Sequence, residues 1–236
     1  MADSTTLRPG IRTFKPRRSR ITRREQRALE NPGGLLITQQ DFTFDFNALF
    51  EVTTPPVLEI GFGIGDATLA YAQSQPDVPI LAIDVHTPGV GRLIADLQEN
   101  QIANVRVMEA DAITVLEQNV PDQSLSGVRS FFPDPWPKAR HFKRRLVQPA
   151  VIDLVASKLI PGGWWHIATD WPDYAEWIGS TFSAYPAFTG GAIDRPHDRP
   201  ITHFEQRGIN EGRPIVDFRY HLNADCYGKR HISRGK

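Results

Sequence analysis

The amino-acid sequence predicts an α/β fold with a mostly parallel sheet and an antiparallel C-terminal strand, on the basis of three observations. Short apolar runs alternate with helical patterns between residues 57 and 182, as in chains that cover a parallel sheet with helices. Residues 214–222 instead alternate apolar and polar side chains, which is typical of an antiparallel edge strand. Hydrophobic residues make up 40% of the 236 residues and charged residues 23%, as expected of a globular domain.

Five strand–helix units follow one another along the chain. Strands are predicted at residues 57–60, 80–83 and 105–108, in the run that ends at Phe131-Phe132, and at residues 164–168. The helices predicted behind them cover residues 66–72, 91–99, 113–118, 144–158 and 174–182. In doubly wound sheets of this kind, ligands bind at the carboxyl ends of the strands, so the residues that follow each strand are the candidate site.

The first 34 residues differ in composition from the rest of the chain. Residues 1–30 carry nine Lys and Arg against three acids, whereas the whole chain is neutral, so the remainder has a net charge of −6. The segment closes in the turn-forming run Asn31-Pro32-Gly33-Gly34. We expect a basic, flexible arm over residues 1–34 and a single domain over residues 35–236. Such an arm is either a solvated tail or a segment that contacts nucleic-acid phosphates.

The composition also excludes several classes of protein. No apolar run approaches the roughly 18 residues of a membrane-spanning helix, and the first residues lack the apolar core of a secretory signal. Cys226 is the only cysteine, which excludes an intrachain disulfide and a thiolate metal cluster. The seven histidines show no metal-ligand spacing, so no metal site is expected. These features predict a cytoplasmic protein.

A glycine-rich loop, Glu59-Ile60-Gly61-Phe62-Gly63-Ile64-Gly65-Asp66, follows the first predicted strand. Gly61, Gly63 and Gly65 allow a tight turn and the close approach of a ligand to the backbone. A dinucleotide-binding loop is one interpretation, but Asp66 stands where that pattern has its third small residue, and an acid is unfavourable beside a pyrophosphate. S-adenosylmethionine carries a sulfonium and an ammonium group and no phosphate, so acids such as Glu59 favour it.

Two further acids follow the next two strands. Asp84 lies 19 residues beyond Gly65, where a carboxylate can accept both ribose hydroxyls, and Asp111 can accept from the adenine amine. Taken singly, each acid is better explained by a helix N-cap or a solvated side chain. Three acids at three successive strand ends match the amine, the ribose and the adenine together. The arrangement resembles the Rossmann-like fold of class I S-adenosylmethionine-dependent methyltransferases.

The fourth strand ends in the proline-rich run Phe131-Phe132-Pro133-Asp134-Pro135-Trp136-Pro137-Lys138. Its three prolines fix three φ angles and remove three backbone donors, which stiffens the loop around Asp134 and Trp136. Trp136 is a candidate stacking surface for an unstacked base, or else an ordinary packed tryptophan. Five cations that suit a polyphosphate backbone follow the acid: Lys138, Arg140, Lys143, Arg144 and Arg145. A solvated helix start also explains the cations, but not the acid at the centre of a rigid loop.

Residues 59–205 resemble the bacterial tRNA (guanine-N7-)-methyltransferases of the TrmB type. The matching motifs are Glu59-Ile60-Gly61-Phe62-Gly63, His86-Thr87-Pro88-Gly89-Val90-Gly91, Phe132-Pro133-Asp134-Pro135-Trp136-Pro137-Lys138, Thr169-Asp170-Trp171 and Thr202-His203-Phe204-Glu205-Gln206-Arg207-Gly208. The resemblance implies that S-adenosylmethionine is the cofactor and that a guanosine in the tRNA variable loop is methylated. It implies tRNA as the partner, with no membrane and no obligate protein partner.

The resemblance also implies roles for individual residues. The cofactor is bound by Glu59, Gly61, Gly63, Gly65, Asp84, Asp111 and Asp134, of which Asp134 is the catalytic position. The guanosine or its tRNA is contacted by Lys138, Asp170, Thr202, His203, Phe204 and Glu205. The chain departs from the family at His203, where Lys is usual, and at Asp84, where Glu is more frequent. Arg129 and Ser130 also interrupt what should be an apolar fourth strand.

The chemistry of the acceptor limits what Asp134 has to do. Guanine N7 carries an in-plane lone pair and no proton, so the transfer needs no general base and depends on positioning and electrostatics. Our hypothesis is that Asp134 accepts hydrogen bonds from N1–H and the 2-amino group and stabilises the purine cation that forms.

Three other functions fit parts of the pattern. A non-catalytic RNA-binding protein on the same scaffold would not need the set of acids at the strand ends. A methyltransferase acting on a protein or a small molecule would not need the two basic segments, which favour tRNA. An NAD-dependent oxidoreductase is disfavoured by Asp66 in the glycine-rich loop.

Overall fold

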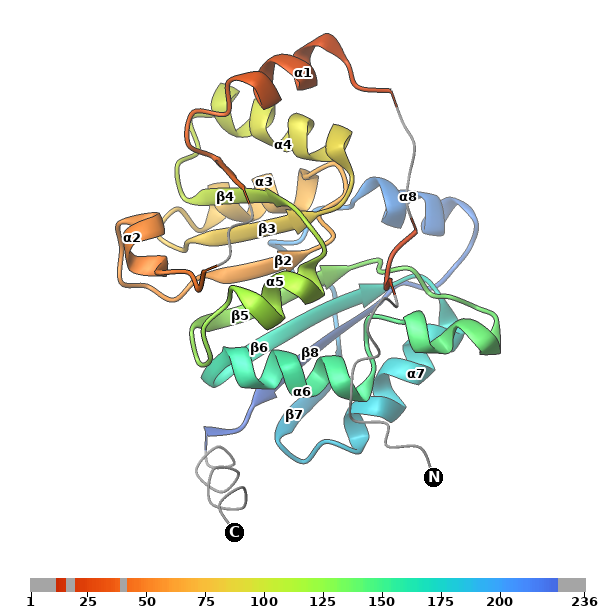
Figure 1. Ribbon diagram of the computed structural model, residues 1–236. Helices are drawn as coiled ribbons and strands as arrows, with labels where there is room; N and C mark the ends of the chain where they lie inside the picture. The colour runs from red at the N-terminus through yellow and green to blue at the C-terminus, as the bar shows by residue number, and fades with distance from the viewer. Residues whose placement is uncertain (1–11, 16–19, 39–41, 225–236) are drawn as a thin grey trace.

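A computed structural model describes residues 12–15, 20–38 and 42–224, and a single sheet runs through it (Figure 1). The strands are β1 (Leu36–Ile37), β2 (Val57–Ile60), β3 (Ile80–Asp84), β4 (Val105–Glu109), β5 (Leu125–Phe131), β6 (Leu159–Thr169), β7 (Phe188–Ile193) and β8 (Val216–Leu222). The helices are α1 (Arg23–Glu30), α2 (Phe46–Phe50), α3 (Asp66–Ser74), α4 (Thr87–Glu99), α5 (Ala112–Gln118), α6 (Pro149–Lys158), α7 (Pro172–Ser183) and α8 (His203–Asn210), with a 3-10 helix, η1, over Ala139–Arg144.

The strand order is β1-β4-β3-β2-β5-β6-β8-β7. Neighbouring strands from β1 to β6 run parallel, and β8 is antiparallel to both β6 and β7. This confirms the predicted α/β class with its antiparallel C-terminal end. The chain leaves β2 toward β3 and β4 and then crosses to β5 on the other side, so the order reverses between β2 and β5. Ligands of doubly wound sheets bind at that point.

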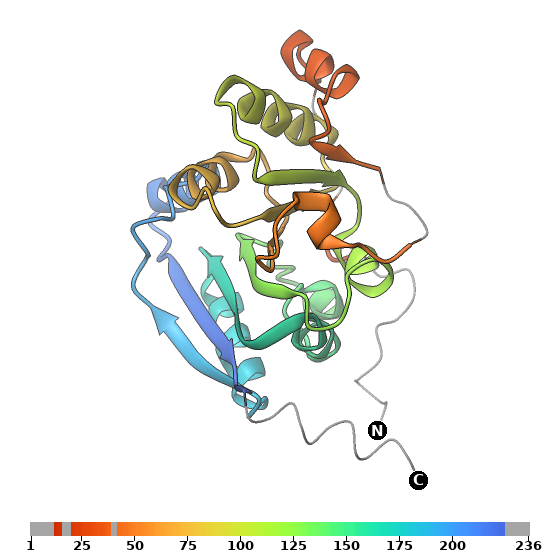
Figure 2. The same ribbon diagram turned by 90° about the vertical axis from the view of Figure 1, so that its left-hand side faces the viewer.

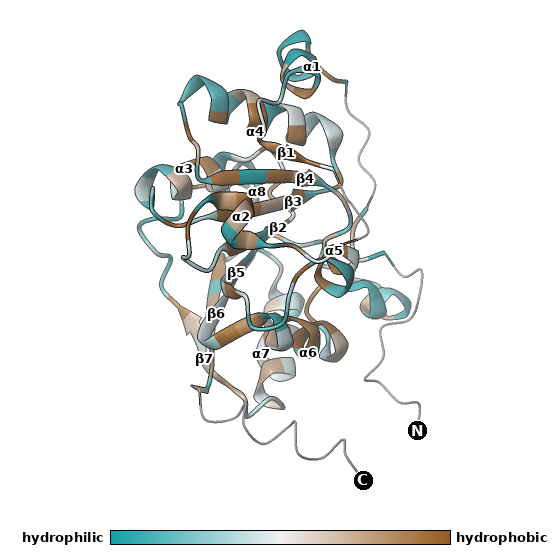
Figure 3. Ribbon diagram, turned by 60° about the vertical axis from the view of Figure 1, so that its left-hand side comes forward, coloured by the Kyte–Doolittle hydropathy of each residue, from teal (hydrophilic) through white to brown (hydrophobic). Residues whose placement is uncertain are grey.

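Alternate residues of the central strands pack into two separate layers of helices. In β3, Leu81 and Ile83 join a core with α5, α6 and α7, whereas Ile80 and Ala82 join a core with α4. This alternation follows from the twofold period of a strand, and it explains why the strands of a sheet covered on both faces are apolar at most positions. Figures 1 and 2 show the two helical layers, and Figure 3 shows the hydrophobic residues concentrated in the strands between them.

Two predictions about the second half of the sheet were wrong. Residues 214–222 were expected at the sheet edge, but β8 is covered on its outer side by β7. The predicted helix over residues 144–158 begins only at Pro149, because Arg145 and Gln148 have extended backbones between η1 and α6. Proline at the first helical position then starts α6 without losing a hydrogen bond.

Part of the predicted N-terminal arm is helical and packs on the domain. Thr22 and Glu25 form a reciprocal capping box at the start of α1, and Arg24 pairs with Asp96 at 2.6 Å on α4. A Cβ on Gly91 would lie 2.8 Å from the Glu25 carbonyl oxygen, so only glycine allows this approach. Residues 1–11 and 16–19 of the arm lie outside the described residues, and its boundary at residue 34 stays a prediction.

Candidate functional site

An open cleft lies at the carboxyl ends of β2, β3, β4 and β5, where the strand order reverses. Its empty volume, with open solvent included, is about 820 Å³. The predicted cofactor residues that line it are Gly61, Gly63, Asp84, Asp111 and Asp134. The topology therefore brings together acids that are up to 50 residues apart in the sequence.

Asp84 ties the glycine-rich loop to the start of α4. Its Oδ2 accepts the Gly63 N–H at 2.7 Å, and its Oδ1 accepts the His86 N–H at 2.9 Å. Burial raises the pKa of this carboxyl above its usual value, against the lowering effect of these backbone donors. Each carboxylate oxygen keeps a further lone pair, so both oxygens can still accept a hydrogen bond from a hydroxyl group of a ligand.

Two glycines, Gly89 and Gly65, allow the close packing of helices on the loop. A Cβ on Gly89 would lie 1.9 Å from the Gly63 carbonyl oxygen, so the His86-Thr87-Pro88-Gly89-Val90-Gly91 motif lets α4 pack on the loop. Gly65 has φ +89° and precedes α3, where a Cβ would meet Leu93 at 2.8 Å. Gly65 is therefore required by packing and is not among the cleft-lining residues.

Asp111 combines the two interpretations that the sequence left open. Its Oδ1 accepts the Ile113 N–H at 3.0 Å, which makes it the N-cap of α5. It also lines the cleft next to Ala110 and Ala112. The cap fixes the side chain, and the lone pairs that the cap does not use remain for a ligand amine.

Asp134 lines the cleft and contacts the N-terminal segment. Its Oδ2 accepts the Lys15 backbone N–H at 2.7 Å, and Thr13, Phe14 and Lys15 line the cleft with it. Nothing in the sequence beyond the basic composition of the arm pointed to these three residues. The Trp136 indole donates to the Thr13 carbonyl oxygen at 3.1 Å and is only 5% exposed. Trp136 is thus a packed tryptophan here, with its ring near the cations of Lys15 and Arg144.

Arg145 supports the proline-rich loop from behind. Its Nε donates to the Pro135 carbonyl oxygen at 2.9 Å, and its guanidinium lies over the rings of Phe142, Tyr174 and Trp177. Burial lowers the pKa of Arg145 from its usual value. The prediction that Arg145 suits a polyphosphate backbone was wrong, because its side chain is buried. Lys138, Arg140 and Lys143 are exposed and Arg144 is partly exposed.

Glu59 is paired with Arg129 rather than open to the cleft. The two residues are in register on neighbouring strands β2 and β5, and Glu59 Oε2 lies 3.1 Å from Arg129 Nη1. Burial raises the pKa of Glu59, and the positive charge of Arg129 opposes this. Arg129, which looked like an interruption of the fourth strand, is therefore the counter-ion of an acid on the adjacent strand. Glu59 borders a second, smaller pocket beside the glycine-rich loop.

The residues predicted to contact the guanosine divide into three groups. Thr202, His203 and Phe204 line the smaller pocket, and Phe204 also lines the main cleft. In contrast, Asp170 accepts from Arg213 at 2.6 and 2.9 Å, and Glu205 is buried against Arg199. Lys138 is exposed just before η1. The structure brings Phe204 to the cleft and Thr202 and His203 to the smaller pocket, and it pairs the two acids with arginines.

Two further properties bear on the class of site. Within residues 12–15, 20–38 and 42–224, no group of three or more His, Cys, Asp and Glu side chains is placed to hold a metal ion. In the same residues, no helix is long and apolar enough to cross a bilayer.

Solved structures confirm the fold class. The 16S rRNA methyltransferase KamB superposes with a TM-score of 0.56 at 15% sequence identity, covering 78% of this chain and 95% of that one. TrmN from Thermus thermophilus superposes with a TM-score of 0.51 at 16% identity, covering 75% of this chain and 46% of that one. At these identities the likeness shows the fold alone, which is that of class I methyltransferases.

Sequence relatives are much closer. A family model described as "Putative methyltransferase" matches residues 53–218. A tRNA (guanine-N(7)-)-methyltransferase of Streptomyces avermitilis is 46% identical over 88% of this chain and 73% of that protein. Enzymes of the same name from Nitrosospira multiformis and Alkalilimnicola ehrlichii are 42% and 44% identical over 92% and 93% of this chain, and over 96% and 95% of their own lengths. The chain therefore belongs to the tRNA (guanine-N(7)-)-methyltransferase family.

Proposed function

We propose that this protein transfers the methyl group of S-adenosylmethionine to N7 of a guanosine in the variable loop of tRNA. The observation that carries the proposal is the meeting of Asp134 with Asp84 and Asp111 in one cleft, in a chain 42–46% identical to enzymes of that name. Because its substrate is tRNA, the proposal includes a cytoplasmic location.

The donor groups of the cleft fit S-adenosylmethionine better than a dinucleotide. Asp66 occupies the first turn of α3, where a pyrophosphate would have to bind, and is paired with Arg92 at 3.2 Å. Asp84 would hold the ribose, Asp111 the adenine, and the glycine-rich loop the amino-acid part of the cofactor. When bound, the cofactor supplies a methyl group activated by its sulfonium charge.

The residues around the methyl acceptor orient the base and balance its charge. Held by Asp84, Asp111 and the glycine-rich loop, the cofactor would supply the methyl group to N7 and would leave as a neutral thioether that keeps the electron pair of the sulfur–carbon bond. The purine becomes a cation, and the Asp134 carboxylate stabilises it through hydrogen bonds to N1–H and the 2-amino group. Pro133 and Pro135 hold that carboxylate in place. No proton is removed from N7, so Asp134 serves as a positioning and charge-stabilising group rather than as a base.

Exposed cations beside the cleft support a polyanionic substrate. Lys138, Arg140 and Lys143 lie between the proline-rich loop and α6, and no acid interrupts them between residues 138 and 145. Cations placed in this way release counterions from the phosphates of a nucleic acid on binding. The reaction rate at limiting tRNA should therefore fall steeply as salt is raised from about 50 to 200 mM. A protein or small-molecule acceptor would not show this dependence.

Mapping of the product tests the proposal. Bulk tRNA is incubated with the protein and isotopically labelled S-adenosylmethionine, digested by nuclease, and analysed by mass spectrometry at the level of fragments and nucleosides. We expect the label in 7-methylguanosine within variable-loop fragments. Label in another nucleoside would overturn the assignment of the acceptor atom. The absence of label in tRNA, with label in a protein or small-molecule fraction, would overturn the substrate class.

A further inference from the structure

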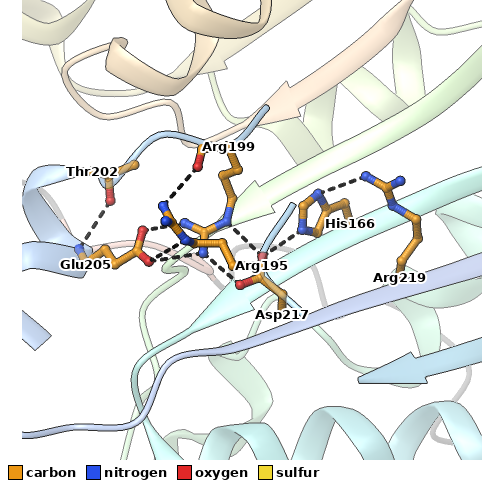
Figure 4. Close-up of polar contacts among 7 residues, drawn as sticks. All are labelled: His166, Arg195, Arg199, Thr202, Glu205, Asp217 and Arg219. Atoms are coloured by element: carbon orange, nitrogen blue, oxygen red, sulfur yellow. Dashed lines mark hydrogen bonds and ion pairs between the residues drawn. The ribbon is translucent and has the colours of Figure 1, made fainter. Parts of the chain in front are cut away.

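A buried cluster of charged residues joins the first turn of α8 to strands β6 and β8 (Figure 4). At its centre is Arg199, which is 1% exposed although arginine is rarely buried. Its Nε and Nη2 donate to the two oxygens of Asp217 at 2.8 and 2.7 Å. Its Nη1 and Nη2 donate to the two oxygens of Glu205 at 2.5 and 3.2 Å. One guanidinium therefore holds two carboxylates in paired geometry, which is specific to arginine.

The cluster is anchored to the sheet by a second buried contact. Asp217, on β8, lies 2.8 Å from His166 Nε2 on the neighbouring strand β6. Burial would raise the pKa of Asp217, but hydrogen bonds from His166 and Arg199 outweigh it and lower that pKa. Asp217 thus remains ionised at neutral pH, as a fixed partner for Arg199. Asp217 attaches the cluster to the sheet through β8, and Glu205 attaches it to the first turn of α8.

The two helix starts with the sequence Thr-x-x-Glu show what the cluster does to Glu205. At α1, the Glu25 side chain folds back and accepts the Thr22 backbone N–H at 2.6 Å, which completes a capping box. At α8, Thr202 accepts the Glu205 N–H at 3.2 Å, but the Glu205 carboxylate is turned inward to Arg199. In a capping box, the partner of this glutamate would be the Thr202 backbone N–H. Here the partner is Arg199, which is itself bound to Asp217 on β8.

Arg199 also lies against the other wall of the site. Its guanidinium carbon is 5.5 Å from the centre of the Phe131 ring and 5.7 Å from that of Phe132. These two residues directly precede Pro133-Asp134, and both line the main cleft and the smaller pocket. The first turn of α8 lines the same smaller pocket through Thr202, His203 and Phe204. The buried Arg199 side chain therefore contacts both Phe131-Phe132 on one side of the site and Glu205, in the first turn of α8, on the other.

We propose that Arg199 is the positioning residue of the guanosine site. By binding Asp217 and Glu205 together, it fixes the first turn of α8 relative to the Phe131-Phe132 wall, and so fixes residues 202–205 relative to Asp134. Arg199 itself does not touch the reacting atoms. This inference rests on the proposed function, because it assigns to that reaction the segment that Arg199 holds.

The position of the cluster separates its effect from cofactor binding. Asp84 and Asp111 accept hydrogen bonds from backbone N–H groups, and none of the hydrogen bonds described above links them to Arg199, Asp217 or Glu205. Loss of Arg199 should therefore displace the acceptor without disturbing the cofactor. A misplacement of about 1 Å can lower the rate of a positioned reaction on the order of 100-fold.

The test compares Arg199→Gln with Arg199→Lys and with Arg195→Gln as a matched control. Arg195 is about 43% exposed, lies 3.9 Å from Glu205 and donates to the backbone carbonyl oxygen of Arg199 at 3.2 Å. Its loss therefore removes a nearby charge and one backbone contact, but it leaves the Arg199 guanidinium paired with both carboxylates. The single-turnover methylation rate is measured at saturating tRNA, and S-adenosylhomocysteine binding is measured by calorimetry. Each methylation rate is divided by the number of S-adenosylhomocysteine molecules bound per chain, so that unfolded chains do not lower the rate.

We expect Arg199→Gln to lower the normalised rate by roughly 10- to 100-fold, with the Kd of S-adenosylhomocysteine within about threefold. Arg199→Lys should recover part of the rate, because an ammonium can bind one carboxylate but not both in paired geometry. Arg195→Gln should stay within about threefold. The double variant Arg199→Gln/Glu205→Gln should be no slower than the slower single variant, since the two residues act as one unit.

The outcomes separate this inference from the proposed function. If the wild-type protein does not methylate tRNA, the proposed function fails. If the wild type is active and Arg199→Gln keeps its normalised rate within twofold, the positioning role is overturned. It is overturned equally if the Kd of S-adenosylhomocysteine rises by the same factor as the rate falls, if Arg195→Gln is as slow as Arg199→Gln, or if the effects in the double variant multiply.

Discussion

Five acids around the candidate site differ in the groups that bind them, and the difference follows the two halves of the sheet. In the first half, Asp84 and Asp111 follow β3 and β4 and accept hydrogen bonds from backbone N–H groups. In the second half, Asp170, Glu205 and Asp217 are bound by arginine side chains. The first group lines the cleft, whereas the second group joins β6, β8 and the segments that surround them.

The difference shows how a carboxylate can be held in one position and still accept hydrogen bonds from a ligand. A backbone N–H neutralises little of the charge, and the carboxylate keeps lone pairs and negative potential for a ligand. An arginine takes up two oxygens at once, which offsets the cost of burying the charge but leaves less for a ligand. Glu59 follows the second pattern within the first half, because Arg129 lies in register with it on β5.

The largest expected effect concerns that exception. Arg129→Met leaves the buried Glu59 without its counter-ion, and we expect it to lower the free energy of unfolding by about 3–5 kcal/mol. Urea titration followed by circular dichroism measures this. The double variant Arg129→Met/Glu59→Gln should regain part of the loss, because no uncompensated charge remains.

An exposed pair serves as the control for this measurement. Arg207 and Glu211 lie 2.9 Å apart on the surface around α8, and Arg207→Ala should cost less than about 1 kcal/mol. Equal losses from Arg129→Met and Arg207→Ala would contradict the structural role given to Arg129. If Glu59→Gln leaves the stability unchanged and strongly weakens cofactor binding, then Glu59 binds the cofactor, as the family resemblance implied.

The second effect concerns the acid that faces the acceptor. Asp134→Asn keeps the shape of the side chain but removes its charge, so we expect the single-turnover rate to fall roughly 100- to 1000-fold. The affinity for S-adenosylhomocysteine should stay within a few-fold, because Asp84 and Asp111 are intact. Asp173→Asn, in the exposed first turn of α7, is the matched control and should be silent. Near-normal methylation by Asp134→Asn would contradict the mechanism.

The smallest effect is a pH dependence of stability. Burial lowers the pKa of His166 below its usual value, although Asp217 opposes the shift. The unfolded chain therefore takes up a proton near pH 6.5 that the native His166 does not, and stability falls as the pH drops below that value. We expect His166→Gln to flatten the change in unfolding free energy between pH 7.5 and 5.5 by about 1 kcal/mol or less. His197→Gln, at an exposed position, should leave the slope unchanged, and equal slopes in the wild type and His166→Gln would refute the assignment.

Much of the fold could be predicted where local patterns were strong. Residues 57–60, 80–83 and 105–108 agree with β2, β3 and β4 to within one residue, because each is a short, mostly apolar run between turn signals. The edge strand β7 could not be predicted, since it contains Gly190-Gly191 and is largely exposed. Its presence depends on pairing with β8, which follows it by more than 20 residues.

The candidate site was predictable to the extent that topology alone places residues. Asp84, Asp111 and Asp134 all follow parallel strands, so their meeting at one edge follows from the fold class. The partners of the other acids did not follow. Arg129 is 70 residues from Glu59, and only the register of β2 with β5 pairs them.

Binding of S-adenosylhomocysteine to Asp84→Asn and Asp217→Asn, measured side by side by calorimetry, tests the central distinction most directly. Both substitutions remove one carboxylate charge, the first from the group held by backbone N–H and the second from the group held by arginine. We predict that Asp84→Asn weakens binding by about 10-fold or more, since a hydrogen bond to a charged group contributes about 1.5–3 kcal/mol. Asp217→Asn should stay within about threefold per folded chain. Equal weakening in both variants, or unchanged binding in Asp84→Asn, would contradict the division of the acids into a cofactor group and a positioning group.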